Sequence, residues 1–405
     1  MEEWKEDKLI DLLDRLIDYR GKTPVKTETG VPLITAKIIK NGRIETPTEF
    51  IAEDNYNSWM VRGFPREGDV VLTTEAPLGE VAQLDNRKIA LAQRIVCLRG
   101  KTGILDNAYL KYFFMSNIGR SRLCARETGT TVTGIKQSEL KEVLISYPSY
   151  VIQQKVSAIL KSLDSKIELN RRINDNLEQQ AQALFKSWFV DFEPFKDGKF
   201  VESELGMIPE GWSIKPLRDF ITTSKKTVNP QRYPNIVFTH YSLPACDNGL
   251  QPENQYGSEI MSNKIVLEDN TILFSKLNPR IKRIWFTSLI ENNSVCSTEF
   301  IPYKALNRKQ YSFVYSLINS KLFYSYVLGF VNGATGSHQR FRAEDSLNLN
   351  FSFNDAVVDK FCNLMNPILA KTHSLRMEIL SLSKIRNLLL PKLMSGELKI
   401  NNLHR

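Results

Sequence analysis

The residues that come closest to a catalytic pattern in this sequence are two Gly-Lys-Thr triplets, at residues 21–23 and 100–102. This triplet ends the loop in which many nucleotidases hold phosphates, where the lysine contacts phosphate and the hydroxyl binds magnesium. The complete loop also needs a glycine five residues before the glycine of the triplet. Leu16 and Ile95 occupy those positions, so we expect no ATP hydrolysis by this route.

Base-modifying, hydrolytic and nuclease patterns are also missing. An amino-methyltransferase holds a flipped base with Asn-Pro-Pro and an aromatic residue, but the pairs at Asn229, Asn278 and Asn366 do not continue in this way. The sequence lacks the Gly-x-Ser-x-Gly elbow and the Gly-x-Gly-x-x-Gly loop. Glu75 and Glu80 flank a predicted strand end, and we interpret them as solvated loop acids. The sequence therefore predicts a protein with no catalytic residues.

Histidines and cysteines do not show the short paired spacing of zinc ligands. An odd, scattered set of cysteines favours reduced thiols over a disulfide framework. We therefore expect no metal site and no cofactor in this chain. The residues concerned are Cys97, Cys124, Cys246, Cys296, Cys362, His240, His338, His373 and His404.

The charge of the chain favours a polyanionic partner. The formal net charge is +9 and the sequence pI is about 9.1, which raises the expectation of nucleic-acid binding. No apolar run approaches the roughly 18 residues of a membrane span, and the charged N-terminus lacks a secretory apolar stretch. We expect a cytoplasmic protein that contacts no membrane.

Two glycine-containing turns are the first candidates for DNA contact, at residues 129–134 and 333–336. Small residues let the backbone approach phosphate, while glutamine and arginine can bond bidentately to base edges. An equally weighted alternative is a turn whose Thr and Ser side chains cap the next element. The candidates are Thr131, Thr133, Lys136, His338, Gln339, Arg340 and Arg342.

A second candidate cluster follows a predicted strand and contains Lys276, Arg280 and Lys282. Cations at this density could neutralise phosphates. The alternative is a solvated basic turn without a partner.

These loops belong to an internal repeat. Trp4, Leu9 and Asp11 reappear in the same order as Trp212, Leu217 and Asp219. Further matches follow in order: residues 68–73 with 268–275, 109–117 with 311–319, and 129–134 with 333–337. Short alternating runs predict strands, and residues 107–123 and 309–330 have helical spacing. We therefore expect two copies of one α+β domain.

Each copy ends in a long helix whose apolar residues alternate in steps of four and three, the rhythm of a coiled coil. We predict that the two helices pair antiparallel if a pseudo-two-fold axis relates the copies, and that Pro391 stops the second helix. The alternative is two amphipathic helices that each pack on their own domain. The predicted pairing and docking residues are Ile152, Val156, Leu163, Leu177, Leu184, Phe361, Ile368, Leu375, Ile379 and Leu382.

Three stretches, at residues 183–194, 206–212 and 389–398, make the chain resemble the specificity subunits of type I restriction-modification systems. The resemblance covers essentially the whole chain. It implies two target-recognition domains that each read half of a split, asymmetric DNA site. It also implies two modification subunits docked on the helices, and restriction subunits beyond them. S-adenosylmethionine, ATP and Mg²⁺ would then belong to those partners, in a prokaryotic cytoplasm.

The expected organisation is α+β, with two target-recognition domains in pseudo-two-fold arrangement joined by two long helices that form an antiparallel coiled coil. The predicted domains are residues 1–148 and 205–353, the helical regions are 149–190 and 354–400, and the linker is 191–204. The competing hypotheses are a helical scaffold without DNA specificity and an unrecognised nuclease in one domain. No base-contacting residue follows from the resemblance, because recognition domains in this family differ with their targets.

Overall fold

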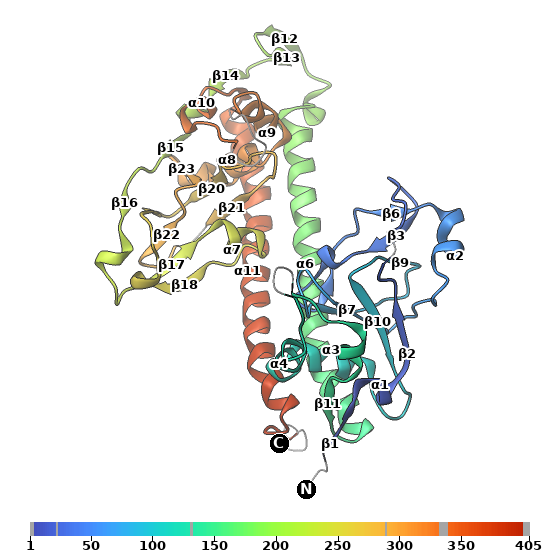
Figure 1. Cartoon of the computed structure of the whole chain (residues 1–405). Helices are drawn as coiled ribbons and strands as arrows, with labels where there is room; N and C mark the ends of the chain where they lie inside the picture. The colour runs from blue at the N-terminus through green and yellow to red at the C-terminus, as the bar shows by residue number, and fades with distance from the viewer. Residues whose placement is uncertain (1–3, 22, 130–132, 288–289, 332–338, 400–405) are drawn as a thin grey trace. The chain divides into compact units, whose positions relative to one another are not determined.

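A computed structural model describes residues 4–21, 23–129, 133–287, 290–331 and 339–399 (Figure 1). The residues divide into two compact units by their contacts: unit 1 comprises residues 1–168 and 381–405, and unit 2 comprises residues 169–380. Among the predicted site residues, Thr131 and His338 lie outside the described residues.

Unit 1 is built on a four-stranded antiparallel sheet in the order β2-β10-β7-β8. All four residues of β7 are buried, and this explains why its sequence is a continuous apolar run rather than an alternating one. The strands are β2 (Leu13–Asp18), β10 (Ile95–Gly100), β7 (Val70–Thr73) and β8 (Val81–Gln83).

Smaller elements surround this sheet in unit 1. A second sheet, in the order β6-β3-β9, contains the parallel pair β3–β9, and β1 pairs with β11. These strands, with a short hairpin, are β6 (Phe50–Ile51), β3 (Val31–Ile34), β9 (Ala90–Leu91), β1 (Lys5–Lys8), β11 (Leu144–Tyr147), β4 (Ile39–Lys40) and β5 (Arg43–Ile44). The short helices are α1 (Leu9–Leu12), α2 (Tyr56–Trp59) and α5 (Gln137–Lys141).

Unit 2 repeats this plan. Its antiparallel sheet has the equivalent order β15-β23-β20-β21, its second sheet contains the parallel pair β17–β22, and β14 pairs with β24. The shared strands are β15 (Ile221–Thr223), β23 (Phe300–Ala305), β20 (Thr271–Ser275), β21 (Ile284–Thr287), β17 (Val237–Tyr241), β22 (Ser294–Cys296), β14 (Ser213–Pro216) and β24 (Asn350–Phe353). Further elements are β16 (Thr227–Val228), β18 (Glu253–Tyr256), β19 (Lys264–Val266), α7 (Leu243–Asp247) and α10 (Ala343–Ser346). The duplication predicted from the sequence is confirmed at the level of strand order.

A pair of short helices covers the main sheet in each unit. They are α3 (Asn107–Met115) and α4 (Asn117–Cys124) in unit 1, and α8 (Tyr311–Ile318) and α9 (Lys321–Leu328) in unit 2. Ser116 and Ser320 cap the second helix of each pair, since their hydroxyls accept from the backbone N–H of Gly119 and Phe323, both at 3.2 Å. Gly119 also allows the close turn, because a Cβ there would lie 2.1 Å from the Phe113 carbonyl oxygen.

The long helices are α6 (Tyr150–Phe189) and α11 (Asp355–Met394), close to the predicted bounds. Each contributes to both units. The core of unit 1 contains Val156 and Leu160 of α6 with Leu393 of α11. In unit 2, Asn170 Nδ2 donates to Glu378 Oε2 at 2.9 Å, while Phe189 packs on Phe361 with ring centroids 5.1 Å apart. Within unit 2, the two helices therefore run antiparallel.

The prediction that Pro391 stops the second helix is wrong, because α11 continues to Met394. Leu390, Leu393 and Met394 are buried in the core of unit 1, and this packing outweighs the loss of one backbone donor at the proline. Pro367 also lies inside α11.

The predicted linker is not without structure, since η3 (Glu193–Phe195) and β12 (Phe200–Ser203) lie in it, and β12 pairs with β13 (Gly206–Pro209). The boundary between the two units falls inside both long helices, after residue 168 in α6 and after residue 380 in α11. The sequence, in contrast, predicts one separate region for each helix.

The predicted helix-pairing residues are buried or half-buried. Val156, Phe361, Leu375 and Ile379 are buried, and the half-buried ones are Ile152, Leu163, Leu177, Leu184, Ile368 and Leu382. Ile152 and Val156 pack into the core of unit 1, and Leu184, Phe361 and Ile368 into that of unit 2. These five side chains therefore contribute to the cores of the units.

Candidate nucleic-acid interface

Two loop segments, each predicted independently from the sequence to contact DNA, lie side by side in unit 2. The backbone N–H of Asn278 donates to the Gln339 carbonyl oxygen at 2.8 Å, and Leu277 and Arg340 form an antiparallel bridge. The N–H of Lys276 donates to the Glu299 carbonyl oxygen at 2.9 Å. We call these three segments, residues 276–283, 299 and 339–342, corner 2.

A buried aromatic ring fixes which side chains corner 2 exposes. Phe341 is buried in the core and its ring lies 5.8 Å from that of Phe274 in β20. Because extended residues alternate sides, Arg340 and Arg342 on either side of Phe341 are both exposed. Arg342 is the residue before α10 and makes no side-chain cap.

Arg340 is held by a carboxylate. Its Nε and Nη2 each donate to one oxygen of Glu299 at 3.0 Å, the planar two-point geometry that favours arginine over lysine. The hydrogen bond to Glu299 raises the pKa of Arg340 above its ordinary value, so the guanidinium stays charged.

Corner 1 occupies the equivalent place in unit 1 and comprises residues 74–79, 94 and 133–136. Glu75 and Gly134 form an antiparallel bridge, and the N–H of Ile135 donates to the Thr74 carbonyl oxygen at 2.9 Å. The N–H of Thr74 donates to the Arg94 carbonyl oxygen at 2.9 Å, as Lys276 does to Glu299 in corner 2. The same backbone framework therefore supports both corners.

The side chains on this framework differ between the two units. Arg94 Nε lies 2.9 Å from Glu75 Oε1. The ion pair of corner 1 thus takes its arginine from the position that holds Glu299 in corner 2. Gly134 stands where corner 2 has Arg340, and a Cβ at Gly134 would approach the Glu75 Cβ to 3.0 Å. Each corner therefore presents an arginine–carboxylate pair, but the one position that both pairs share holds the arginine in corner 1 (Arg94) and the carboxylate in corner 2 (Glu299).

Left-handed backbone conformations accompany both corners. Ala76 and Asn278, at equivalent places, have φ of 50° and 47°, and Arg94 has φ of 71°. Residues other than glycine rarely adopt these angles, and they concentrate at sites where function requires a particular geometry.

The remaining predicted residues are either exposed or hydrogen-bonded to a neighbouring segment of their unit. Thr133 and Lys136 are exposed in corner 1. Lys136 is the residue before α5, so the cap position of this helix holds neither of the Thr or Ser residues that the capping alternative requires. Arg280 is exposed, and its carbonyl oxygen accepts from the Tyr324 hydroxyl at 2.6 Å. The Nζ of Lys282 donates to the Asn319 carbonyl oxygen. Burial of this amine lowers the pKa of Lys282, and we infer that it positions the loop.

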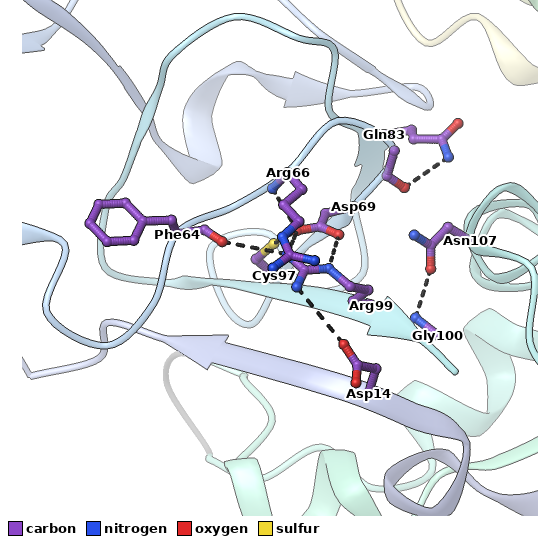
Figure 2. A network of polar contacts seen from close by, with 10 residues as sticks. Asp14, Phe64, Arg66, Asp69, Gln83, Cys97, Arg99, Gly100 and Asn107 are labelled. Atoms are coloured by element: carbon purple, nitrogen blue, oxygen red, sulfur yellow. Dashed lines mark hydrogen bonds and ion pairs between the residues drawn. The ribbon is translucent and has the colours of Figure 1, made fainter. Parts of the chain in front are cut away.

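A buried polar network, missed at the level of sequence, supports the domain of unit 1 (Figure 2). Asp69 is buried, and its carboxylate accepts from Nε and Nη2 of Arg99, both at 2.7 Å, and from the backbone N–H of Arg66 at 2.8 Å. Arg99 Nη2 also donates to the Phe64 carbonyl oxygen at 3.4 Å. Burial and the nearby Asp69 raise the pKa of the Cys97 thiol well above its ordinary value. The network ties the segment around residues 64–66 to strands β7 and β10. Its signal in the sequence is an arginine inside the apolar strand Ile95–Gly100.

A second network joins helix and domain in unit 1. The Asp164 carboxylate of α6 accepts from Lys111 Nζ at 2.9 Å, from the Tyr112 hydroxyl at 2.8 Å and from Arg386 Nη1 of α11 at 3.0 Å. In unit 2, Glu178 of α6 accepts from the Tyr315 hydroxyl at 3.0 Å and from the Asn319 amide. Each unit thus joins its α3 or α8 region to the long helices through a carboxylate of α6.

In the described part of the chain, no three His, Cys, Asp or Glu side chains are grouped to hold a metal ion. No helix of that part is long and apolar enough to cross a membrane.

Comparison with known proteins decides the family. Residues 1–179 match the type I restriction modification DNA specificity domain. The chain is 30% identical to the type I restriction enzyme MjaIX specificity subunit of Methanocaldococcus jannaschii. The alignment spans 99% of this chain and 95% of that protein. The chain belongs to the type I restriction enzyme specificity subunits.

Further similarities agree with this assignment. The specificity subunit is 33% identical over 148 residues to the HindI specificity subunit of Haemophilus influenzae, which covers 35% of this chain and 30% of the relative. The crystal structure of the S subunit from M. genitalium has a TM-score of 0.56 at 17% identity and covers 97% of this chain and 96% of the other, which shows a shared fold.

Membership of this family determines the general role of the chain. It is the DNA-recognition subunit of a type I restriction-modification system and is non-catalytic, because the enzymatic activities of such systems lie in partner subunits. The alternative hypothesis of a scaffold without DNA specificity is not favoured by these relatives.

Proposed function

We propose that each unit of this specificity subunit reads one half of a bipartite, asymmetric DNA site. The observation that carries the proposal is the pair of corners. Both contain an equivalent antiparallel bridge, Glu75 with Gly134 and Leu277 with Arg340, and an equivalent backbone hydrogen bond donated by Thr74 or Lys276, yet they present different side chains. A shared framework with different exposed groups is what two different half-sites require, since base edges are read by side chains.

Phosphate contacts are assigned to the exposed cations beside each corner. Lys136 in corner 1 and Arg280 and Arg342 in corner 2 are exposed and could neutralise phosphates while the corner lies against the bases. The predicted contacts at Thr133, Lys276 and Gln339 belong to the same two surfaces.

The long helices would set the spacing of the half-sites and dock two modification subunits. Exposed apolar side chains on α11, namely Leu364, Ile385 and Leu388, are available for such a partner. S-adenosylmethionine, ATP and Mg²⁺ would be bound by the modification and restriction subunits, in the cytoplasm of a prokaryote.

The test is co-expression of the chain with the modification subunit of its own system, followed by single-molecule sequencing of the methylated DNA. We expect one motif made of two specific parts separated by an unspecific gap. Methylation without a sequence motif, or a motif without a gap, would contradict the proposal.

A further inference from the structure

We propose that Arg94 and Arg340 each read one guanine, through the major groove, in the half-site of their own unit. Glu75 and Glu299 hold these two arginines ready for the base. The inference rests on the proposed function and deepens it by assigning specificity to single side chains. Arginine bonds to O6 and N7 of guanine with two parallel N–H donors, which no other base pair accepts in the same pattern.

Arg340 has the donors that this contact needs while it remains bound to Glu299. A guanidinium carries five N–H donors, and Glu299 takes one from Nε and one from Nη2. The terminal edge formed by Nη1 and the second hydrogen of Nη2 has no other partner within the described part of the chain. Arg340 is 46% exposed in its side chain and Glu299 is 27% exposed, so the more buried carboxylate lies behind the more exposed cation.

Arg94 is arranged in the same way in unit 1. Its Nε lies 2.9 Å from Glu75 Oε1, and among the described residues the guanidinium of Arg94 contacts no second carboxylate. The side chain of Arg94 is 53% exposed and that of Glu75 is 39% exposed. The left-handed backbone of Arg94, at φ of 71°, is the kind of local strain that functional positions retain.

A purely structural role explains these pairs less well. Exposed ion pairs contribute little to stability, and the backbone hydrogen bonds at Thr74 and Lys276 already close each corner. Moreover, the one position that the two pairs share holds Arg94 in unit 1 and Glu299 in unit 2, and the partner comes from a different position in each unit. The two units therefore keep an arginine on each corner although its place in the chain changes.

A phosphate contact is the main competing role, and substitution by lysine separates the two. Lysine keeps the positive charge but loses the fork, so a phosphate contact would survive in R94K and R340K. A guanine contact would lose its planar two-point geometry and with it most of its discrimination. Lysine also adopts φ of 71° no more easily than arginine, so R94K leaves the backbone strain unchanged.

The experiment uses the complex of the full chain with its modification subunit, and the readout is the methylated motif. We expect R340K to relax one G·C position in one half-site and R94K to relax one in the other, with discrimination at that position falling about 5- to 150-fold. The matched control is R87K, because the side chain of Arg87 is 53% exposed, as is that of Arg94, and pairs with Asp85 at 2.8 Å outside both corners. R87K should leave both half-sites unchanged.

A binding measurement tests the contact itself. Replacing the guanine at the relaxed position with 7-deazaguanine removes its N7 acceptor. The wild-type complex should lose affinity for this duplex, whereas the matching lysine variant should show no further loss. Additive effects of the two changes would overturn the inference.

Three results would overturn the inference while leaving the proposed function intact. They are a wild-type half-site without any G·C pair, lysine variants that keep the wild-type motif, and a relaxed position in the half-site of the other unit. If the wild-type complex itself gives no bipartite motif, the proposed function fails instead.

Discussion

Replacing Asp164 with alanine should lower the melting temperature of unit 1 strongly, because it would strand two buried cations. Asp164 accepts from Lys111, Tyr112 and Arg386 at distances of 2.8 to 3.0 Å. The side chains of Lys111 and Arg386 are only 9% and 15% exposed, so water replaces the lost carboxylate poorly. Removing one partner of a buried ion pair costs about 3–5 kcal/mol.

This cost can be converted to temperature. For a unit of this size, each kcal/mol shifts the midpoint by about 2–4 °C, so D164A should lower the melting temperature by about 6–20 °C. The measurement is far-UV circular dichroism during heating. The matched control is E142Q, which removes an exposed ion pair at 2.6 Å with Lys8 in the same unit and should leave the melting temperature unchanged.

The dependence on pH supplies a second test of Asp164. Burial raises its pKa, but Lys111 and Arg386 outweigh burial and hold the pKa below its ordinary value. A lowered folded-state pKa means that the stabilisation is complete above the unfolded pKa of about 3.9 and is lost as pH falls through the folded one. The difference between wild type and D164A should therefore be constant from pH 7 to pH 5 and shrink below about pH 4.

The reasoning about Asp164 would be refuted by a D164A variant that melts like E142Q. A double variant, D164A with K111M, provides an internal check. It removes one stranded cation and should recover part of the lost stability, because apolar replacement of buried ion pairs is well tolerated.

Three further predictions concern the helices, the core and the DNA contacts. Inserting four residues in register into both α6 and α11 should lengthen the gap of the methylated motif by about one or two base pairs, since each helical residue adds roughly 1.5 Å; an unchanged gap would exclude a spacing role. G119A should destabilise unit 1 by about 1–3 kcal/mol in urea unfolding, because the new methyl group overlaps the Phe113 carbonyl, and wild-type stability would show that α3 and α4 can separate freely. K136A should reduce the salt slope of DNA binding by about one while the motif stays the same, and a changed motif would indicate a base contact instead.

Local pattern was sufficient to predict the long helices and the duplicated plan. The alternation of apolar residues from Ile152 to Leu184 places α6 almost to the residue, because helical periodicity is a local property. The prediction at Pro391 is wrong because it also rests on a local property alone. The local effect of a proline is to break a helix, but the burial of Leu390 and Leu393 decides the outcome, and burial depends on distant parts of the chain.

The corners could be predicted only in part. Arg340 and Lys136 were identified because they adjoin glycine turns with a recognisable composition. Arg94 was not, because a single arginine before a strand has no pattern of its own. Its proposed role depends on the ion pair with Glu75 and on the bridge of Glu75 to Gly134, which are contacts between segments distant in sequence. Which side chains share a surface is fixed by such long-range register, which alternation within one strand does not encode.

The sharing of α6 and α11 between the units also bears on the order of folding during synthesis. Unit 2 is one continuous stretch, residues 169–380, whereas unit 1 needs residues 381–405 in addition to residues 1–168. Leu390, Leu393 and Met394, which complete its core, leave the ribosome only after all of unit 2. At 5–20 residues per second, unit 1 waits about 10–45 s for Leu390, Leu393 and Met394 to complete the core that already contains Val156 and Leu160. The half of the protein that is made first is therefore expected to be the last to close.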